Sequence, residues 1–168
     1  MQHRATPYLI AIADLDIHGD PIEGAKGFQR FINLNKCAAA FFNTGLQALD
    51  CRTFGLWALR SALETPLPEV NSELDPPDAF IPAAAAWVTI AGAKLYQLDE
   101  EFEYGGVHGD PGVGGPLWND GHGFCKERWR FWRRRFGELY SSSDLSDDLR
   151  SIAKQAADRM QGIENDVS

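Results

Sequence analysis

The spacing of apolar residues is the feature that most restricts what this chain can fold into. Between residues 20 and 45 apolar residues recur every three or four positions, as in a helix that buries one face. The stripe consists of Ile22, Ala25, Phe28, Phe31 or Ile32, Ala38, Phe41 or Phe42, and Leu46. Asp20, Pro21 and Glu23 suit the first turn, where a side chain caps free amides and an acid faces the positive helix end.

Two more helices are expected in the middle of the chain. The first covers about residues 51–64 after Asp50 as its cap, and it is apolar on two opposite sides, which predicts a central position. The second begins around Pro82, runs through a series of alanines, and ends in the acids of residues 99–103. Gly92 and the alanines would allow a neighbouring helix to approach this helix closely.

The C-terminal third of the chain predicts two further helices. The segment 124–140 is rich in aromatic residues and arginines, and the amphipathic segment 144–161 follows Ser143 or Ser146 as a cap. Residues 162–168 are polar, so we expect this tail to fray.

Three segments do not predict long helices. Residues 7–17 suggest a short helix, although their β-branched content leaves a strand open, and the prolines in 65–80 predict an extended connector. Residues 105–123 contain eight glycines and two prolines and predict a long loop. The chain lacks a good alternating run for a sheet. We therefore expect an all-α, single-domain fold over residues 1–168, with five to six helices in orthogonal or bundle-like packing.

Charge and cysteine content restrict the partners. The chain has 24 acidic and 16 basic residues, a net charge of -8, which disfavours nucleic acid because nucleic acid is itself a polyanion. Three cysteines without a CxxC spacing favour a reducing compartment, the cytoplasm or else the nucleus. No uninterrupted apolar run approaches membrane-spanning length and no N-terminal signal is evident, so we expect a soluble protein without a membrane partner.

The aromatic and arginine-rich helix separates into faces when it is projected at helical spacing. Its core face carries Cys125, Trp129, Trp132, Phe136, Leu139 and Tyr140. Its opposite face carries Lys126, Arg130, Arg133 and Arg134, which we expect in solvent and paired at long range with the acids of 99–103.

Arg128 and Arg135 lie on an apolar flank of the same helix, beside Phe124 and Phe131. A buried arginine requires a carboxylate or an anionic ligand, because an unpaired buried charge is strongly unfavourable. The polar stripe of the central helix carries Arg60 and Glu64. Glu64 is the expected partner of Arg128, and an anionic ligand is the alternative.

The loop and the start of the next helix contain the residues that carry chemistry. His108, Asp110, Asp120 and His122 could supply metal ligands, but their spacing matches no strong signature, so we predict neither a metal nor a cofactor. His122 with Asp120 is the better candidate, as a catalytic acid and base, against ordinary capping and surface roles. Cys125 is interpreted as a buried structural cysteine rather than a nucleophile.

Three segments together resemble a known family. In order, "FGLWALRSALE", "AAAAWVTIAGAKLY" and "GGPLWNDGHGFCKERWRFWRRRF" resemble small helical proteins of filamentous fungi grouped as a domain of unknown function. The resemblance covers about residues 20–140, and its most specific residues are Gly115, Pro116, Leu117, Trp118, Gly123, Phe124, Arg128, Trp129, Trp132 and Phe136. It implies a helical fold and no agreed activity. Some members are encoded beside enzymes of secondary metabolism, which implies small apolar partners.

Two functions remain open, and the sequence does not decide whether the chain is an enzyme. In the first, it is a non-catalytic module that binds another protein, and the loop is a clasp built on Pro116, Trp118 and the pair of Glu64 and Arg128. In the second, Trp118, Phe124 and Arg128 line a pocket for a small apolar molecule, and His122 with Asp120 transfers protons in an isomerisation, cyclisation or dehydration. The orientations of Trp118 and His122 distinguish the two.

Overall fold

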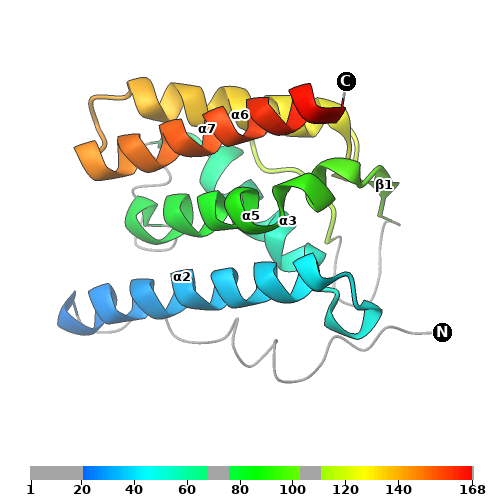
Figure 1. The fold of residues 1–168 in the computed structure, drawn as a ribbon. Coiled ribbons are helices and arrows are strands. Elements are labelled where there is room, and N and C mark those ends of the chain that lie inside the picture. Colours follow the sequence, from blue (N-terminus) through cyan, green and yellow to red (C-terminus); the bar gives the residue numbers. More distant parts are fainter. Residues whose placement is uncertain (1–20, 68–75, 103–110, 168) are drawn as a thin grey trace.

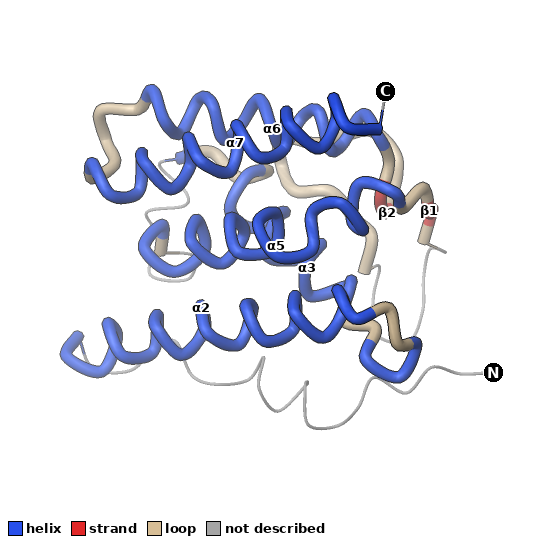
Figure 2. The backbone as a smooth tube through the Cα atoms, in the orientation of Figure 1, coloured by secondary structure: helices blue, strands red, loops and turns tan. Residues whose placement is uncertain are grey.

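The structure is a computed structural model that describes residues 21–67, 76–102 and 111–167. Over these residues it consists of helices and one very short two-stranded sheet, so the predicted all-α class is confirmed (Figures 1 and 2). In chain order the elements are α2 (Pro21–Thr44), the 3-10 helix η1 (Gln47–Leu49), α3 (Arg52–Leu63), α5 (Pro77–Gln97), β1 (Glu100–Glu101), β2 (Gly123–Phe124), α6 (Lys126–Ser141) and α7 (Asp147–Val167).

Helix α5 is the centre of the arrangement. It packs against α2 on one side and α7 on the other, and α3 lies behind it (Figure 1). Helices α2, α5 and α7 run in the same direction, and α6 runs back along α7 (Figure 1). The central helix expected from the sequence, α3, is also largely buried, because its two apolar sides face different neighbours.

The core forms around the aromatic residues of α5 and α6. Trp87 of α5 is fully buried, and its indole N–H donates to Asn35 Oδ1 of α2 at 2.8 Å. Trp129, Trp132 and Phe136 of α6 are at most 2% exposed, as their spacing predicts. By length and composition α5 could cross a membrane, with a mean hydropathy of 1.3, but 67% of its most apolar window is buried inside the fold. This is the expected behaviour of a core helix.

The start of α5 corrects the sequence prediction. The helix begins at Pro77 rather than around Pro82, so the predicted connector 65–80 ends at Pro76. Pro82 lies inside the helix, where it lacks the N–H that would bond to the carbonyl of Asp78. Asp78 is exposed, so water can reach this end of the helix, and burial of Phe80 and Ile81 favours the added turn.

The end of α5 differs as well. The helix stops at Gln97, and Glu100–Glu101 form β1, which pairs antiparallel with β2. Helix α6 accordingly begins at Lys126 instead of residue 124. Backbone pairing between segments distant in sequence produces this small sheet, and a two-residue strand has no detectable alternation.

Several details at helix ends were predicted wrongly. Helix α7 continues to Val167, because burial of Met160 and Ile163 holds its last turns against the fold. Leu46 and Tyr140 are exposed by 61% and 46%, although each belongs to a predicted apolar stripe. Of the alternatives Phe41 and Phe42, Phe42 packs against the core and Phe41 is exposed. Leu46 follows the end of α2, where helical periodicity no longer applies. The predicted segment 7–17 lies outside the described residues.

Substitution of Gly55 tests the close packing of α3 on α5. A Cβ atom at Gly55 would lie 2.8 Å from the ring of Trp87, which is fully buried and cannot move aside easily. We expect Gly55→Ala to lower the free energy of unfolding by about 1 to 3 kcal/mol in urea denaturation. Gly137→Ala is the matched control, since a Cβ there meets nothing within 4 Å. That helical substitution should raise stability by about 0.5 to 1 kcal/mol. Equal effects of the two would contradict the packing.

Candidate functional site

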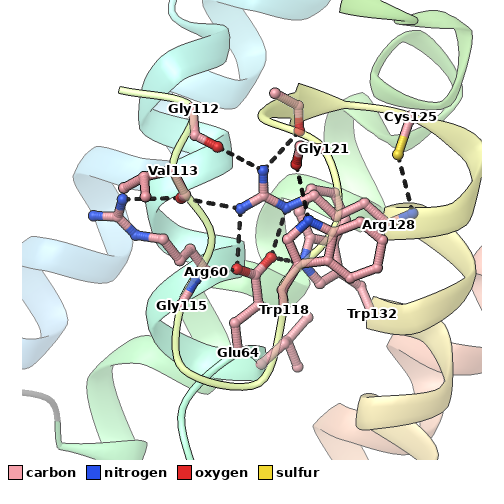
Figure 3. Close-up of polar contacts among 12 residues, drawn as sticks. Arg60, Glu64, Gly112, Val113, Gly115, Trp118, Gly121, Cys125, Arg128 and Trp132 are labelled. Atoms are coloured by element: carbon pink, nitrogen blue, oxygen red, sulfur yellow. Dashed lines mark hydrogen bonds and ion pairs between the residues drawn. The ribbon is translucent and has the colours of Figure 1, made fainter. Parts of the chain in front are cut away.

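The loop before α6 runs along the outer side of α3 (Figure 3). The indole N–H of Trp57 donates to the carbonyl of Pro111 at 3.2 Å, and Arg60, one turn later, donates to the carbonyl of Val113 at 3.3 Å. At the end of the helix, the N–H of Leu117 donates to the carbonyl of Glu64 at 2.9 Å. The loop therefore follows α3 from Trp57 to its C-terminal cap, Glu64.

Glu64 and Arg128 form an ion pair at the centre of this region, and both side chains are completely buried (Figure 3). Arg128 Nε lies 2.7 Å from Glu64 Oε1, and Arg128 Nη2 lies 2.9 Å from Glu64 Oε2. This two-pronged geometry is the strongest that a guanidinium and a carboxylate adopt. The pairing of Arg128 with Glu64 that the sequence predicts is present.

The remaining donors of Arg128 bind the backbone of the loop. Nη1 donates to the carbonyls of Gly112 and Gly123 at 2.9 and 2.8 Å, and Nη2 donates to Val113 at 3.2 Å. A guanidinium has five N–H donors, so the chain itself uses all of them. Arg128 thereby ties both ends of the described loop to α6.

The carboxylate of Glu64 is satisfied in the same way. Oε1 accepts from the indole N–H of Trp132 at 2.6 Å in addition to Arg128, and Oε2 accepts from the N–H of Gly115 at 2.7 Å. Four hydrogen bonds saturate a carboxylate. Because burial of an ion pair is unfavourable unless its hydrogen bonds are complete, this saturation is what makes the pair tolerable in the core.

Two glycines are required by this geometry. A Cβ at Gly115 would lie 2.7 Å from Glu64 Cβ, so no other residue could bring its N–H to the carboxylate. Gly123 has a φ of 116°, a conformation that side chains strongly disfavour, and its carbonyl is one of those that Arg128 binds. Between them, the N–H of Trp118 donates to the carbonyl of Gly115 at 3.0 Å, closing a turn with Pro116 at its second position.

Trp118 points into the fold and is 7% exposed. Its ring centroid lies 5.3 Å from that of Phe131, and its indole N–H donates to the carbonyl of Gly121 at 3.0 Å. The guanidinium carbon of Arg128 lies 5.8 Å from the Trp118 ring. Phe124 is also buried, at 3% exposure, and contacts Trp132. The aromatic residues proposed as a ligand surface are therefore packed against the protein itself.

Neither Asp120 nor Trp118 lines the hollow beside His122. Asp120 is exposed, and His122 is half-buried and borders a hollow of about 200 Å³. The hollow is lined by Asp99, Glu100, Glu101, Gly121, His122, Gly123, Phe124 and Cys125. Trp118 and Arg128 do not line it. The other two metal-ligand candidates, His108 and Asp110, lie outside the described residues, and no group of three or more potential metal ligands occurs within the described part.

Cys125 is the N-terminal cap of α6, and it is half-buried rather than buried as predicted. Its Sγ accepts a hydrogen bond from the N–H of Arg128 at 3.4 Å. Burial raises the pKa of the Cys125 thiol, although this hydrogen bond acts in the opposite direction. A raised pKa leaves little thiolate near neutral pH, which opposes a role as nucleophile.

The exposed arginines of α6 are paired, but not with the acids expected from the sequence. Arg133 lies 3.0 Å from Glu164 of α7. Two further pairs lie within α6, Arg130 with Glu127 at 3.5 Å and Arg134 with Glu138 at 3.8 Å. The expected long-range pairing is wrong for these three residues, because α7 and acids of α6 itself are nearer.

Lys126 differs from these arginines. Its ammonium lies 3.7 Å from the ring centroid of Tyr96 and binds the Tyr96 carbonyl at the end of α5. Glu100, one of the acids expected to meet the arginine face, instead pairs with Arg52 of α3. The turn after α5 places this acid within reach of Arg52.

Sequence reasoning missed the backbone groups of this site. The carbonyls of Gly112, Val113 and Gly123 and the N–H of Gly115 complete the ion pair, but every residue carries such groups. Only the glycine content of the loop signalled that the backbone approaches other atoms closely. Arg135, expected to need a carboxylate, donates to the carbonyl of Leu63 at 2.9 Å besides pairing with Glu138.

Fold and site together define a small all-α domain in which a glycine-rich loop is fastened by a saturated, buried ion pair. Residues 12–136 match the model of a family described as "Protein of unknown function (DUF3632)". The match covers well over half of the chain, so the chain belongs to this family. It includes the whole clasp and excludes α7. Among curated proteins and solved structures, nothing matches the chain.

Glu64→Gln should strongly destabilise the protein. The substitution keeps the size of the side chain but removes the charge that Arg128 faces in the core, and one partner of a buried pair is then uncompensated. We expect a loss of about 3 kcal/mol or more in the free energy of unfolding. Glu138→Gln, which removes partly exposed ion pairs, should change it by less than about 1 kcal/mol. Unaltered stability of Glu64→Gln would contradict a stabilising role for the ion pair between Glu64 and Arg128.

Trp118→Ala tests whether Trp118 is a core residue or is kept for binding. Loss of its contact with Phe131 should lower the free energy of unfolding by about 3 kcal/mol or more in a denaturant titration. Trp57→Ala, at a residue that is 37% exposed, should lose about 1 kcal/mol. A change near zero for Trp118→Ala would indicate an exposed side chain available to a ligand.

Proposed function

We propose that the chain is a non-catalytic helical module that acts by binding another protein, and that the loop is its structural clasp. One observation carries the proposal: the chain itself occupies all five donors of Arg128 and four acceptor positions on Glu64. Catalytic and ligand sites depend on polar groups that remain available to a substrate. A saturated pair in a dry core instead supports a structural role.

The outer side of the clasp supplies the surface for binding. Trp57, Val113 and Leu117 are exposed by 37%, 39% and 36%. The loop runs beside α3, so Trp57 and Val113 lie close together: Trp57 binds the carbonyl of Pro111, and Arg60 binds that of Val113. Exposed aromatic residues held in one orientation are typical anchors of protein interfaces. The clasp would thus hold the loop residues of this surface in position.

The second candidate function is binding of a small apolar molecule, with proton transfer by His122 and Asp120. The hollow beside His122 favours it, because acids of β1 and the preceding turn line the hollow together with His122. The reaction would be an isomerisation, cyclisation or dehydration, as an accessory to secondary metabolism. Trp118 and Arg128 do not line the hollow, which weighs against a pocket that they form together with Phe124.

A cytoplasmic or nuclear location belongs to the same proposal. Cys37, Cys51 and Cys125 are all free thiols, which a reducing compartment maintains. Burial raises the pKa of Cys51, which further limits its reactivity.

The proposed interaction is tested by affinity purification with the tagged full chain from extracts of its own organism. A protein partner should co-purify with the wild type and with Tyr140→Ser, and be lost with Trp57→Ser. Tyr140 is the matched control, since it is an exposed aromatic residue on α6. The anchor role of Trp57 predicts the difference, because loss of a central aromatic anchor typically weakens an interface by 2 kcal/mol or more, about 30-fold.

Two results would contradict the proposed function. One is an identical set of captured proteins for Trp57→Ser and Tyr140→Ser. The other is a co-purifying small molecule, found by native mass spectrometry, that the wild type converts and His122→Ala does not. The second result would instead establish the acid and base function.

A further inference from the structure

An apolar groove lies along helix α5, and none of its lining residues belongs to the clasp. It has a volume of about 240 Å³ and is bordered by three helices, α2, α5 and α7. These helices lie side by side with α5 in the middle (Figures 1 and 2). Its lining residues are Ile32, Lys36, Pro82, Ala85, Ala86, Thr89, Ile90, Ile152, Gln155 and Ala156.

The floor of the groove is one face of α5. Its five residues follow helical spacing from Pro82 to Ile90, and the two in the middle are alanines. Ala85 and Ala86 retain 8% and 7% exposure, whereas Ala83 and Ala84 are completely buried. Small side chains on the floor and isoleucines on the walls leave an apolar trough that solvent reaches.

Positive charge gathers at one end of the trough. Lys36 is the only charged residue in the lining. It follows Ile32 by one turn of α2, and α2, α5 and α7 run in the same direction, so Lys36 lies at the C-terminal end of the groove. Arg159 follows Ala156 by three positions on α7, on the same side and towards the same end. Both are exposed, and neither makes an ion pair with any residue that the structure describes.

The opposite end of the trough carries the opposite charge. Asp148 precedes Ile152 by one turn on α7 and is exposed. The groove is therefore apolar along its length, acidic beyond its N-terminal end, and basic at its C-terminal end. In a chain with a net charge of -8, two exposed cations towards the same end of the groove, neither in an ion pair among the described residues, are a distinct local feature.

We propose that this groove binds a free amphipathic anion, a single-chain carboxylate of medium length. Its hydrocarbon chain lies over Ala85 and Ala86, and its carboxylate lies between Lys36 and Arg159. Burial of each methylene contributes affinity, while the two cations and the distant Asp148 set the direction of the chain. This site is separate from the clasp and from the Trp57 surface, so it does not depend on the proposed protein interaction.

Isothermal titration of the full chain with decanoate, below its micelle concentration, tests the site. We expect saturable binding at one site. Decanol has the same chain without the charge and should bind about fivefold more weakly or worse, as the loss of a partly exposed ionic contact predicts. Acetate has the charge without the chain and should give no saturable heat. Equal affinity for decanol and decanoate, or no saturable binding of decanoate, would overturn the proposal.

Variants locate the binding. Ala86→Leu fills the floor, and Thr89→Phe blocks the groove from an exposed position that tolerates a large side chain, so at least one blocking variant will fold. Either should abolish decanoate binding in a protein whose circular dichroism is unchanged.

Lys36→Glu and Arg159→Glu should each weaken binding about fivefold or more. Lys26→Glu makes the same charge change on another side of α2 and should leave affinity within about twofold. Unchanged affinity in a folded blocking variant, or equal effects of Lys36→Glu and Lys26→Glu, would exclude this site.

Discussion

The ion pair between Glu64 and Arg128 is the interaction on which the rest of the site depends. It joins the C-terminal cap of α3 to the first turn of α6, and its remaining hydrogen bonds hold residues 112–123 against both helices. An ion pair in a dry core is favourable only when every donor and acceptor is satisfied. The glycine-rich loop supplies this satisfaction, so loop and ion pair are each necessary for the other.

The same saturation explains why the most conspicuous motif of the sequence is not an evident active site. Aromatic residues, arginines, histidine and aspartate lie close together along the chain, which is a common composition for catalytic sites. In the folded protein the aromatic residues lie in the core, and the chain itself binds all five N–H donors of Arg128. His122 borders a separate hollow that is lined by acids. Among the described residues, the proposed functions use the outer side of the clasp, that hollow, and the groove along α5.

Helix α5 connects these regions, because it packs against α2, α3 and α7. Its alanines let α2 and α7 lie close on either side, and the same small residues form the groove where those helices do not cover them. Its end directs Glu100 towards Arg52 and leaves Lys126 over Tyr96. Packing at the centre thereby determines which charged residues meet at the surface.

The sequence by itself determined the helical class, the position of four long helices, the core face of α6 and the partner of Arg128. Each follows from local chemistry: apolar spacing requires a buried face, and a buried guanidinium requires a carboxylate. Only the tertiary structure decided where α5 begins, that Glu100–Glu101 pair with Gly123–Phe124, and which carbonyls complete the clasp. The physical reason is that backbone groups are the same in every residue, and burial against distant segments outweighs weak local preferences such as that of Pro82.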